Sequence, residues 1–255
     1  VWYLYSTEYF SFYNQSANTV RLVEDWWIKV FYANILYKNA NFNALQRTIE
    51  EKDPDIVILV EFSDAHEDEL KDFFRERYLY MNRNSWSTML AWDVVFSKIP
   101  LTNITETHLV ETGAWNYSYM QINLADNELV DLYVIHTAAP ISYKNFDMRN
   151  NQISKLKSDF QERWKDSGNP VIIIWDFNIS PRSYYYKNIL TNLHLYNALS
   201  FQKPTYTWSL LDKWVFRSHI DQLFISEGIQ ISEVMIENLV WSDHRSFSFY
   251  FNTKS

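Results

Sequence analysis

Three apolar runs, each typical of a buried β-strand, end in a polar residue, and this pattern constrains the fold most strongly. The runs cover residues 56–60, 132–135 and 171–175, and the residues that follow them are Glu61, His136 and Asp176. The first run, Ile-Val-Ile-Leu-Val, is continuous, as expected for a strand buried on both faces. Open α/β sheets place ligands beyond the carboxyl ends of their strands, so these side chains are expected to converge on one site.

Hydrophobic spacing predicts strands and helices along most of the chain. Helices are expected at 41–51, 65–77 and 145–165. Strands are expected at 27–33, 56–60, 89–97, 117–124, 129–135, 171–175, 219–225, 229–239 and 246–251. In the longest helix, one side is expected to carry Phe146, Ile153, Leu156 and Phe160. Because strands alternate with helices early and cluster late, a mixed α/β fold in packed layers is expected. Residues 1–255 are predicted to form one domain, with residues 1–25 as an irregular N-terminal extension.

Glycine is scarce, with only three residues in 255. Average usage would give roughly 18. The three glycines, Gly113, Gly168 and Gly228, cannot form a G-x-G-x-x-G fingerprint or a P-loop. A dinucleotide cofactor is therefore not expected.

Charge and cysteine content exclude further classes of function. The net charge of −8 makes the chain a poor non-specific binder of polyanions, although a phosphate-containing substrate can still be reached through a bound cation. The chain has no cysteine, which excludes disulfides, thiolate zinc sites and cysteine nucleophiles. A monomer is expected. The sequence does not indicate the cellular compartment. An extracytoplasmic form, or a form anchored in a membrane by a segment preceding Val1, is compatible with it.

Each polar motif also has a structural interpretation when it is taken alone. Glu61 fits a solvated loop residue, and His136 fits a structural histidine with satisfied hydrogen bonds. Asp176-Phe-Asn178 fits a turn in which the side chains bond their own backbone. The pair Asp243-His244 fits a surface loop. Only the combination of these motifs, and their order, favours a functional site.

The motifs occur in a recognisable order along the chain. They are Tyr-Ala-Asn34, Asp53-Pro-Asp55 leading to Glu61, His136-Thr-Ala-Ala-Pro140, Asp176-Phe-Asn178, Ser-His-Ile-Asp221 and Ser-Asp243-His244. Weaker matches are Asp93 to Leu101, Arg149-Asn-Asn-Gln152 and Pro204 to Trp208. Over residues 28 to 251 the chain resembles the endonuclease/exonuclease/phosphatase, or DNase I-like, superfamily. This resemblance implies a four-layer α/β sandwich, with two mixed, mainly antiparallel β-sheets packed face to face and helices outside.

The resemblance also implies a hydrolase acting on phosphate ester bonds and dependent on Mg²⁺ or Mn²⁺. Glu61 is the implied first metal ligand, and Asn34 and Asp243 are implied to complete the metal site. Hard oxygen ligands of this kind suit these cations. The implied substrate is a phosphoester, either nucleic acid or a phospholipid or inositol phosphate headgroup.

The same resemblance assigns catalytic roles to five residues. Asp176 is implied to orient and deprotonate the attacking water, and Asn178 to donate to a phosphoryl oxygen. His244, oriented by Asp221, is implied to contact the scissile phosphate. His136 is implied to protonate the leaving group.

Three residues depart from the family pattern. Trp175 and Trp241 stand where relatives usually have glycine, and Gln222 stands where many have His or Tyr. The two indoles are expected at the mouth of the site, where they would change substrate choice and leave the chemistry in place.

Three hypotheses about the function are compatible with the sequence. The first is a phosphodiesterase or endonuclease. The second is a phosphatase or phosphodiesterase at a membrane surface, which the acidic charge and the aromatic loops favour slightly. The third is a catalytically impaired interaction module whose site is closed by Trp175 and Trp241. Among the loop aromatics, Tyr184, Tyr185 and Tyr186 splay over about 200° on a helix, so at least one is expected to be exposed.

Overall fold

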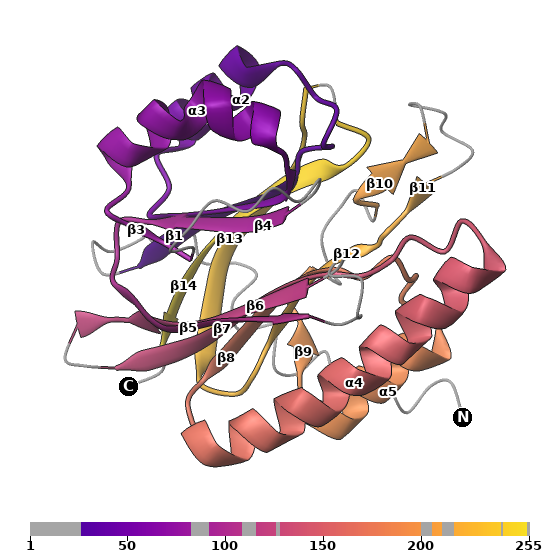
Figure 1. Cartoon of the computed structure of the whole chain (residues 1–255). Coiled ribbons are helices and arrows are strands. Elements are labelled where there is room, and N and C mark those ends of the chain that lie inside the picture. The colour runs from indigo at the N-terminus through magenta and orange to yellow at the C-terminus, as the bar shows by residue number, and fades with distance from the viewer. Residues whose placement is uncertain are drawn as a thin grey trace.

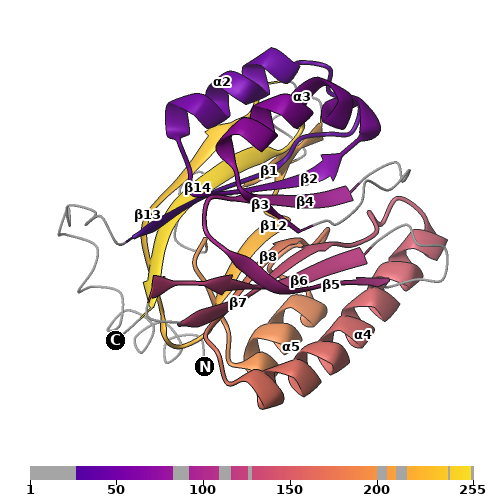
Figure 2. The ribbon, with the colours of Figure 1, turned by 60° about the vertical axis from the view of Figure 1, so that its left-hand side comes forward.

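Two β-sheets pack face to face, and helices cover both outer faces (Figures 1 and 2). This computed structural model describes residues 27–82, 92–108, 116–125, 128–199, 206–210, 217–240 and 242–253. The arrangement confirms the expected four-layer α/β sandwich with mixed, mainly antiparallel sheets. The assignment of residues 1–255 to one domain stays a prediction, and the predicted extension at 1–25 lies outside the described residues.

The first sheet, sheet A, has six strands. Their spatial order is β13 (Ile229–Asn238), β14 (Arg245–Thr253), β1 (Ile28–Asn34), β2 (Ile56–Phe62), β4 (Trp92–Ser97) and β3 (Tyr80–Met81). Strands β1 and β2 are parallel, and the other pairs are antiparallel. Helices α2 (Phe42–Lys52) and α3 (Asp64–Arg77) cover its outer face.

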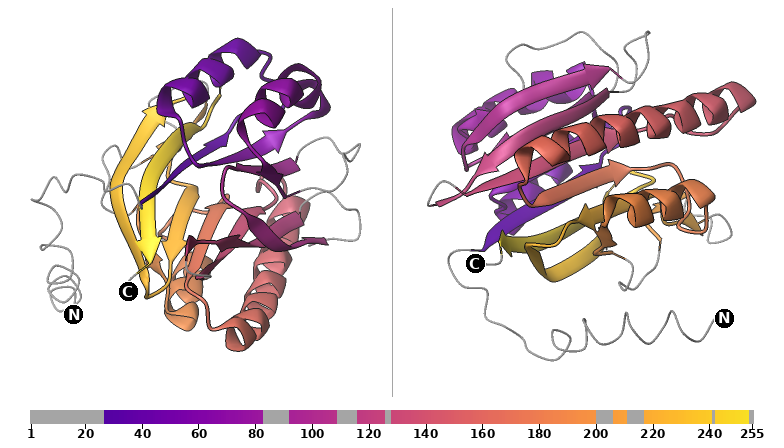
Figure 3. Two further views of the ribbon diagram at one scale, coloured as in Figure 1. Left: turned by 90° about the vertical axis from the view of Figure 1, so that its left-hand side faces the viewer. Right: turned by 90° about the horizontal axis from the view of Figure 1, so that it is seen from below.

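The second sheet, sheet B, also has six strands. Their order is β5 (Leu101–His108), β6 (Asn116–Asn123), β7 (Leu129–His136), β8 (Val171–Asp176), β12 (Asp221–Ile225) and β9 (Tyr196–Asn197). Only β7 and β8 are parallel. Helices α4 (Tyr143–Ser167) and α5 (Tyr184–Leu193) cover its outer face, and α4 extends beyond the strands (Figure 3). A separate ribbon pairs β10 (Trp208–Ser209) with β11 (Arg217–Ser218).

The core between the two sheets follows from the two-residue alternation of strands. Even-numbered residues of β1, β7 and β8, and of β2 as far as Val60, point into the space between the sheets, where Ile58, Leu132 and Ile174 are buried. Odd-numbered residues face the helices, so Phe31 packs towards α2 and α3 and Ile173 towards α4 and α5. By this alternation Asn34, His136 and Asp176 belong to the inner faces of their strands.

Trp175 corrects one expectation drawn from the sequence. It precedes Asp176 in β8 and therefore points to the opposite face, away from the space between the sheets. Its ring is buried in the cluster under α4 and α5 and lies 4.0 Å from the Phe177 ring. Trp175 is thus a core residue of the outer layer and does not line the mouth of the site. Trp241 lies outside the described residues.

Most expected elements are present, with some differences at their ends and on their faces. The predicted helix 145–165 begins at Tyr143, and its residue Phe146 is exposed while Ile153 is buried. Helix α5 and strand β5 were not predicted. Of the three consecutive tyrosines, Tyr184 is 73 % exposed and Tyr186 is 5 % exposed, as the helical geometry requires. Among the described helices, none is long and apolar enough to cross a membrane.

Candidate active site

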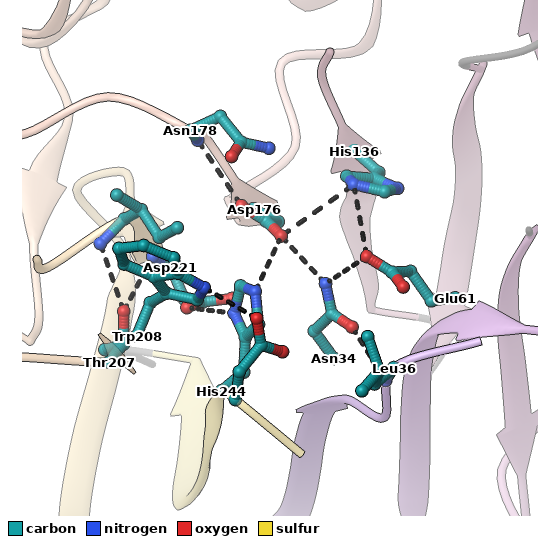
Figure 4. Close-up of polar contacts among 12 residues, drawn as sticks. Asn34, Leu36, Glu61, His136, Asp176, Asn178, Thr207, Trp208, Asp221 and His244 are labelled. Atoms are coloured by element: carbon teal, nitrogen blue, oxygen red, sulfur yellow. Dashed lines mark hydrogen bonds and ion pairs between the residues drawn. The ribbon is translucent and has the colours of Figure 1, made fainter. Parts of the chain in front are cut away.

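The predicted site residues meet at one end of the sandwich because of the strand directions. Asn34, His136 and Asp176 are the last residues of β1, β7 and β8, and Glu61 is the penultimate residue of β2. Strands β12 and β14 run antiparallel to β8 and β1. Their amino ends therefore lie at the same edge, which brings Asp221 and the segment before Arg245 to the site (Figure 4).

Asn34 links the carboxylates of the two sheets. Its Nδ2 donates to Glu61 Oε1 at 3.0 Å and to Asp176 Oδ2 at 2.9 Å. Its Oδ1 accepts the backbone N–H of Leu36 at 3.1 Å, which fixes the orientation of the amide. Asn34 and Asp176 are almost fully buried. The amide therefore holds one carboxylate of sheet A next to one of sheet B.

Glu61 reaches the site through an unusual backbone conformation. Simple alternation along β2 would point its side chain outwards, with Val57 and Leu59, towards the helices. Instead Glu61 has a left-handed φ of 62°, and the pairing with β4 shifts register between Leu59 and Phe62. The Tyr37 backbone N–H then donates to Glu61 Oε2 at 3.0 Å. Such conformations cost energy and cluster at functional sites, so the bulge at Glu61 is a feature of the site.

His136 faces both of these carboxylates. Its Nε2 lies 3.9 Å from Glu61 Oε1 and 3.8 Å from Asp176 Oδ2. In the parallel ladder between β7 and β8, His136 is the neighbour of Asp176. His136 Nε2 thus approaches the same two carboxylate oxygens that accept hydrogen bonds from the Asn34 amide.

His244 and Asp221 form a buried pair on the other side of Asp176. His244 Nδ1 lies 2.9 Å from Asp221 Oδ2, and His244 Nε2 lies 3.8 Å from Asp176 Oδ2. The second oxygen of Asp221 accepts the Tyr32 hydroxyl at 2.7 Å. Thr207 Oγ1 accepts the Asp221 backbone N–H at 2.9 Å. The Nδ1 contact leaves the His244 Nε2 directed towards the space in front of Asp176.

Burial and charge set different protonation preferences for these three groups. Burial and the facing charge of Asp221 raise the pKa of Asp176 to about 6, against the opposing effects of His244, His136 and Asn34. Burial alone would lower the pKa of His244, but Asp221 and Asp176 outweigh it and raise this pKa to about 10. Burial opposes the ionisation of Asp221, yet His244 and the other donors hold its pKa below the usual value. Near neutral pH the pair is therefore an imidazolium and a carboxylate.

Asn178 is held next to Asp176 by its backbone and by its side chain. It has a left-handed φ of 49°, and its N–H lies 3.3 Å from Asp176 Oδ1. Its Nδ2 donates to the Thr137 carbonyl at 2.9 Å, which leaves one amide hydrogen for another acceptor. The Arg149 guanidinium donates to the Asn178 carbonyl at 2.9 Å.

Asp243 is hydrogen-bonded to a tryptophan at the edge of the site. Its Oδ2 accepts the Trp208 indole N–H at 2.8 Å, and among the described residues it forms no hydrogen bond or ion pair with Glu61 or Asn34. Its Oδ1 is buried and has no hydrogen-bond partner among the described residues. The preceding residue, Ser242, donates from Oγ to the Asn34 carbonyl at 2.8 Å, which ties this segment to the site.

Several residues that support the site were not predicted as site residues. They are Tyr32, Thr137, Arg149, Thr207, Trp208 and Ser242. The family resemblance of the segment Pro204 to Trp208 gave a signal for Thr207 and Trp208. The resemblance of Arg149-Asn-Asn-Gln152 gave a signal for Arg149. Tyr32 belongs to the motif Tyr-Ala-Asn34, but only Asn34 was predicted as a site residue, because a tyrosine within a strand is an ordinary core residue.

The donor set suits a hard divalent cation. Three carboxylates, those of Glu61, Asp176 and Asp221, lie near two imidazoles (Figure 4). A fourth, that of Asp243, directly precedes His244 in the chain. Ligand-type atoms of Asp176, Asp221 and His244 lie within 4.8 Å of one another. However, both Asp221 oxygens already accept hydrogen bonds from Tyr32 and His244, so this trio is better described as a hydrogen-bonded network. Glu61, beside Asn34, and the unpartnered Oδ1 of Asp243 offer the better oxygen ligands.

This fold and this site define the chain as a phosphoester hydrolase of the DNase I-like type. The sequence model of the Endonuclease/Exonuclease/phosphatase family matches residues 31–244, and the chain belongs to this family. No curated protein matches the chain in sequence.

Solved structures with the same fold have low sequence identity to this chain. The human Nocturnin catalytic domain with bound sulfate is 19 % identical, with a TM-score of 0.69 over 89 % of this chain and 95 % of that one. Truncated TDP2 from Caenorhabditis elegans is 16 % identical, with a TM-score of 0.71 over 89 % of this chain and 98 % of that one. The mannosyl-6-phosphatase of Bacteroides thetaiotaomicron VPI-5482 is 15 % identical, with a TM-score of 0.68 over 88 % of this chain and 99 % of that one.

Proposed function

We propose that this chain is a Mg²⁺- or Mn²⁺-dependent phosphodiesterase or endonuclease in which Asp176 activates the attacking water. The observation that carries the proposal is the convergence on Asp176 Oδ2. The Asn34 amide lies 2.9 Å from this oxygen, and His136 and His244 each present Nε2 at 3.8 Å. A water seated in front of Asp176 would thus be within reach of one base and two imidazoles.

Glu61 would be the main ligand of the cation, with Asn34 and Asp243 completing its site. Even with both imidazoles protonated, the four carboxylates leave a surplus of two negative charges, which favours a divalent cation. When bound, the cation would act as a Lewis acid on the phosphoryl oxygens.

Each remaining residue has a role that follows from its contacts. Asp176 would accept the proton of the attacking water, since burial has raised its pKa to about 6 and made it a better base than an exposed carboxylate. His244 would donate its Nε2–H to a phosphoryl oxygen, because Asp221 holds its Nδ1. Asn178 would donate its second amide hydrogen to another phosphoryl oxygen. His136 would donate a proton from Nε2 to the leaving oxygen as the ester bond breaks.

The test is hydrolysis of bis-p-nitrophenyl phosphate and of p-nitrophenyl phosphate, with Mg²⁺, with Mn²⁺ and with a chelator. We expect metal-dependent release of p-nitrophenol, mainly from the diester. Asp176→Asn and His244→Gln should abolish most of it, while Asp72→Asn, on the exposed side of α3, should not change it. Activity that survives both site substitutions would overturn the proposal.

A second candidate substrate is a phospholipid or inositol phosphate headgroup. The short loop after His136 exposes Ile141, and the first turn of α4 that follows it exposes Tyr143 and Phe146. Apolar side chains exposed close to the site would suit a membrane surface. Parallel assays on plasmid DNA, on inositol phosphates and on phospholipid vesicles separate the two candidates. A sugar phosphate belongs in the same panel, because the Bacteroides neighbour is a mannosyl-6-phosphatase.

A further inference from the structure

Tyr32 reaches across the sandwich to the carboxylate that orients His244. Its hydroxyl donates to Asp221 Oδ1 at 2.7 Å, while His244 Nδ1 lies 2.9 Å from Asp221 Oδ2. Tyr32 belongs to β1, and His244 immediately precedes β14, so both come from sheet A. Asp221 begins β12 of sheet B. One carboxylate of sheet B is therefore held by two donors from the opposite sheet.

The Tyr32 side chain is held in place by its packing. It is fully buried, and its ring stacks on Phe247 with centroids 4.5 Å apart and planes inclined by 29°. This packing keeps the hydroxyl at the position from which it donates to Asp221 Oδ1.

Rotation of the Asp221 carboxylate would break this hydrogen bond inside the core. A buried acceptor without a partner is costly, and more so when it is charged. The Asp221 backbone is held as well, because its N–H donates to Thr207 Oγ1. With Oδ1 kept on Tyr32, only Oδ2 is left to face His244.

We propose that Tyr32 is a positioning residue for the reaction: it fixes the rotation of the Asp221 carboxylate, which in turn holds His244 in its productive orientation. This inference rests on the proposed function, in which the His244 Nε2 contacts the scissile phosphate. Tyr32 touches neither substrate nor cation and acts only through Asp221.

The first test is Tyr32→Phe, which removes the hydroxyl and leaves the ring stacked on Phe247. With bis-p-nitrophenyl phosphate and Mn²⁺, kcat should fall about 10-fold or more, as for other residues that orient an active-site ligand. KM should change less than twofold. The matched control is Tyr133→Phe, since Tyr133 is equally buried, lies on the outer face of sheet B and has a hydroxyl without a partner among the described residues. The control should keep the wild-type kcat.

The second test does not depend on activity. The proton on His244 Nδ1, bonded to a buried carboxylate, should give a far-downfield ¹H resonance, assigned by its absence in His244→Gln. The resonance should persist in Tyr133→Phe and shift or broaden in Tyr32→Phe. In the wild type, the Tyr32 hydroxyl proton should exchange slowly with solvent, and this measurement needs no variant.

The outcomes separate this inference from the proposed function. If Tyr32→Phe keeps the wild-type kcat and the wild-type resonance while His244→Gln is inactive, the positioning role is wrong and the hydrolase stands. If His244→Gln is also fully active, the proposed function itself fails. If Tyr133→Phe loses as much activity as Tyr32→Phe, the effect comes from general core packing and the positioning role is overturned.

Discussion

Asp176 and Asp221 are directly opposed in the antiparallel ladder between β8 and β12. Both side chains point into the sandwich, are buried, and carry ligand-type oxygens within 4.8 Å of one another. Two buried carboxylates at this distance repel each other when both are ionised. His244 lies between them, with Nδ1 on Asp221 and Nε2 towards Asp176, and its positive charge offsets part of this repulsion.

Asp176→Asn is expected to lower activity and to preserve or raise stability. The amide cannot accept the proton of the water, so kcat should fall about 10²- to 10⁴-fold. The substitution also removes one of the two facing charges, so the midpoint of thermal unfolding in chelator should stay the same or rise. Steady-state kinetics and thermal unfolding on the same preparation check both parts. A clear fall in the unfolding midpoint would mean that Asp176 contributes to stability, contrary to this view.

Glu61→Gln is expected to weaken cation binding more than it weakens folding. The charge that faces Asn34 and His136 is lost, and the Mn²⁺ dissociation constant from isothermal titration should rise about 10- to 100-fold. In the wild type, Mn²⁺ at 100 times its dissociation constant should stabilise the fold by about 2.7 kcal/mol. At the same concentration this stabilisation should fall to about 0.4–1.4 kcal/mol in Glu61→Gln and stay unchanged in Asp72→Asn. Equal Mn²⁺ affinity in wild type and Glu61→Gln would remove Glu61 from the cation site.

Trp175→Phe is expected to affect stability and not substrate choice. The indole is buried between sheet B and its helices, against Phe177, so a smaller ring leaves a cavity. The free energy of unfolding should fall by about 1–3 kcal/mol. The ratio of activities on diester and monoester substrates should equal that of the wild type. A changed ratio would restore the idea that this tryptophan shapes the mouth of the site.

The meeting of the site residues could be predicted from the sequence because it depends on strand ends. Apolar runs identified β2, β7 and β8, and the residues that end them follow without further information. The position of Trp175 was predictable in principle too, since neighbours in a strand point to opposite faces. The prediction followed the family resemblance instead: Trp175 stands where relatives usually have glycine, and this position was expected at the mouth of the site.

Other features depend on contacts that a single sequence does not reveal. The left-handed backbone at Glu61 and the link from Tyr32 to Asp221 both need the two sheets to be placed together. Strand β5 is an edge strand with four exposed residues at described positions and a left-handed Asn103, so it lacks the apolar pattern of a buried strand. Helix α5 does carry buried residues at helical spacing, Tyr186, Ile189 and Leu193, which the run of tyrosines obscured.

His66 is expected to make folding stability depend on pH between about 6.5 and about 4. It lies at the start of α3, where its Nδ1 accepts the Ser63 backbone N–H at 3.2 Å and lies 2.7 Å from Ser63 Oγ. Burial lowers the pKa of His66 to about 4, from 6.5 when unfolded. Between these values the unfolded chain binds the proton and the folded chain does not. The contribution is therefore fully present above pH 6.5 and is lost as the pH falls towards 4, by up to about 3 kcal/mol.

The matched variant for this prediction is His66→Gln. Glutamine at this position can still accept the Ser63 N–H, as in a capping box, but does not titrate. Urea unfolding at pH 7 and pH 4.5 should show that the wild type loses more stability than the variant over this interval. Carboxylates titrate in both proteins, so the difference between the two losses isolates His66. If the wild type and His66→Gln lose the same stability, His66 is not buried in its neutral form at the start of α3.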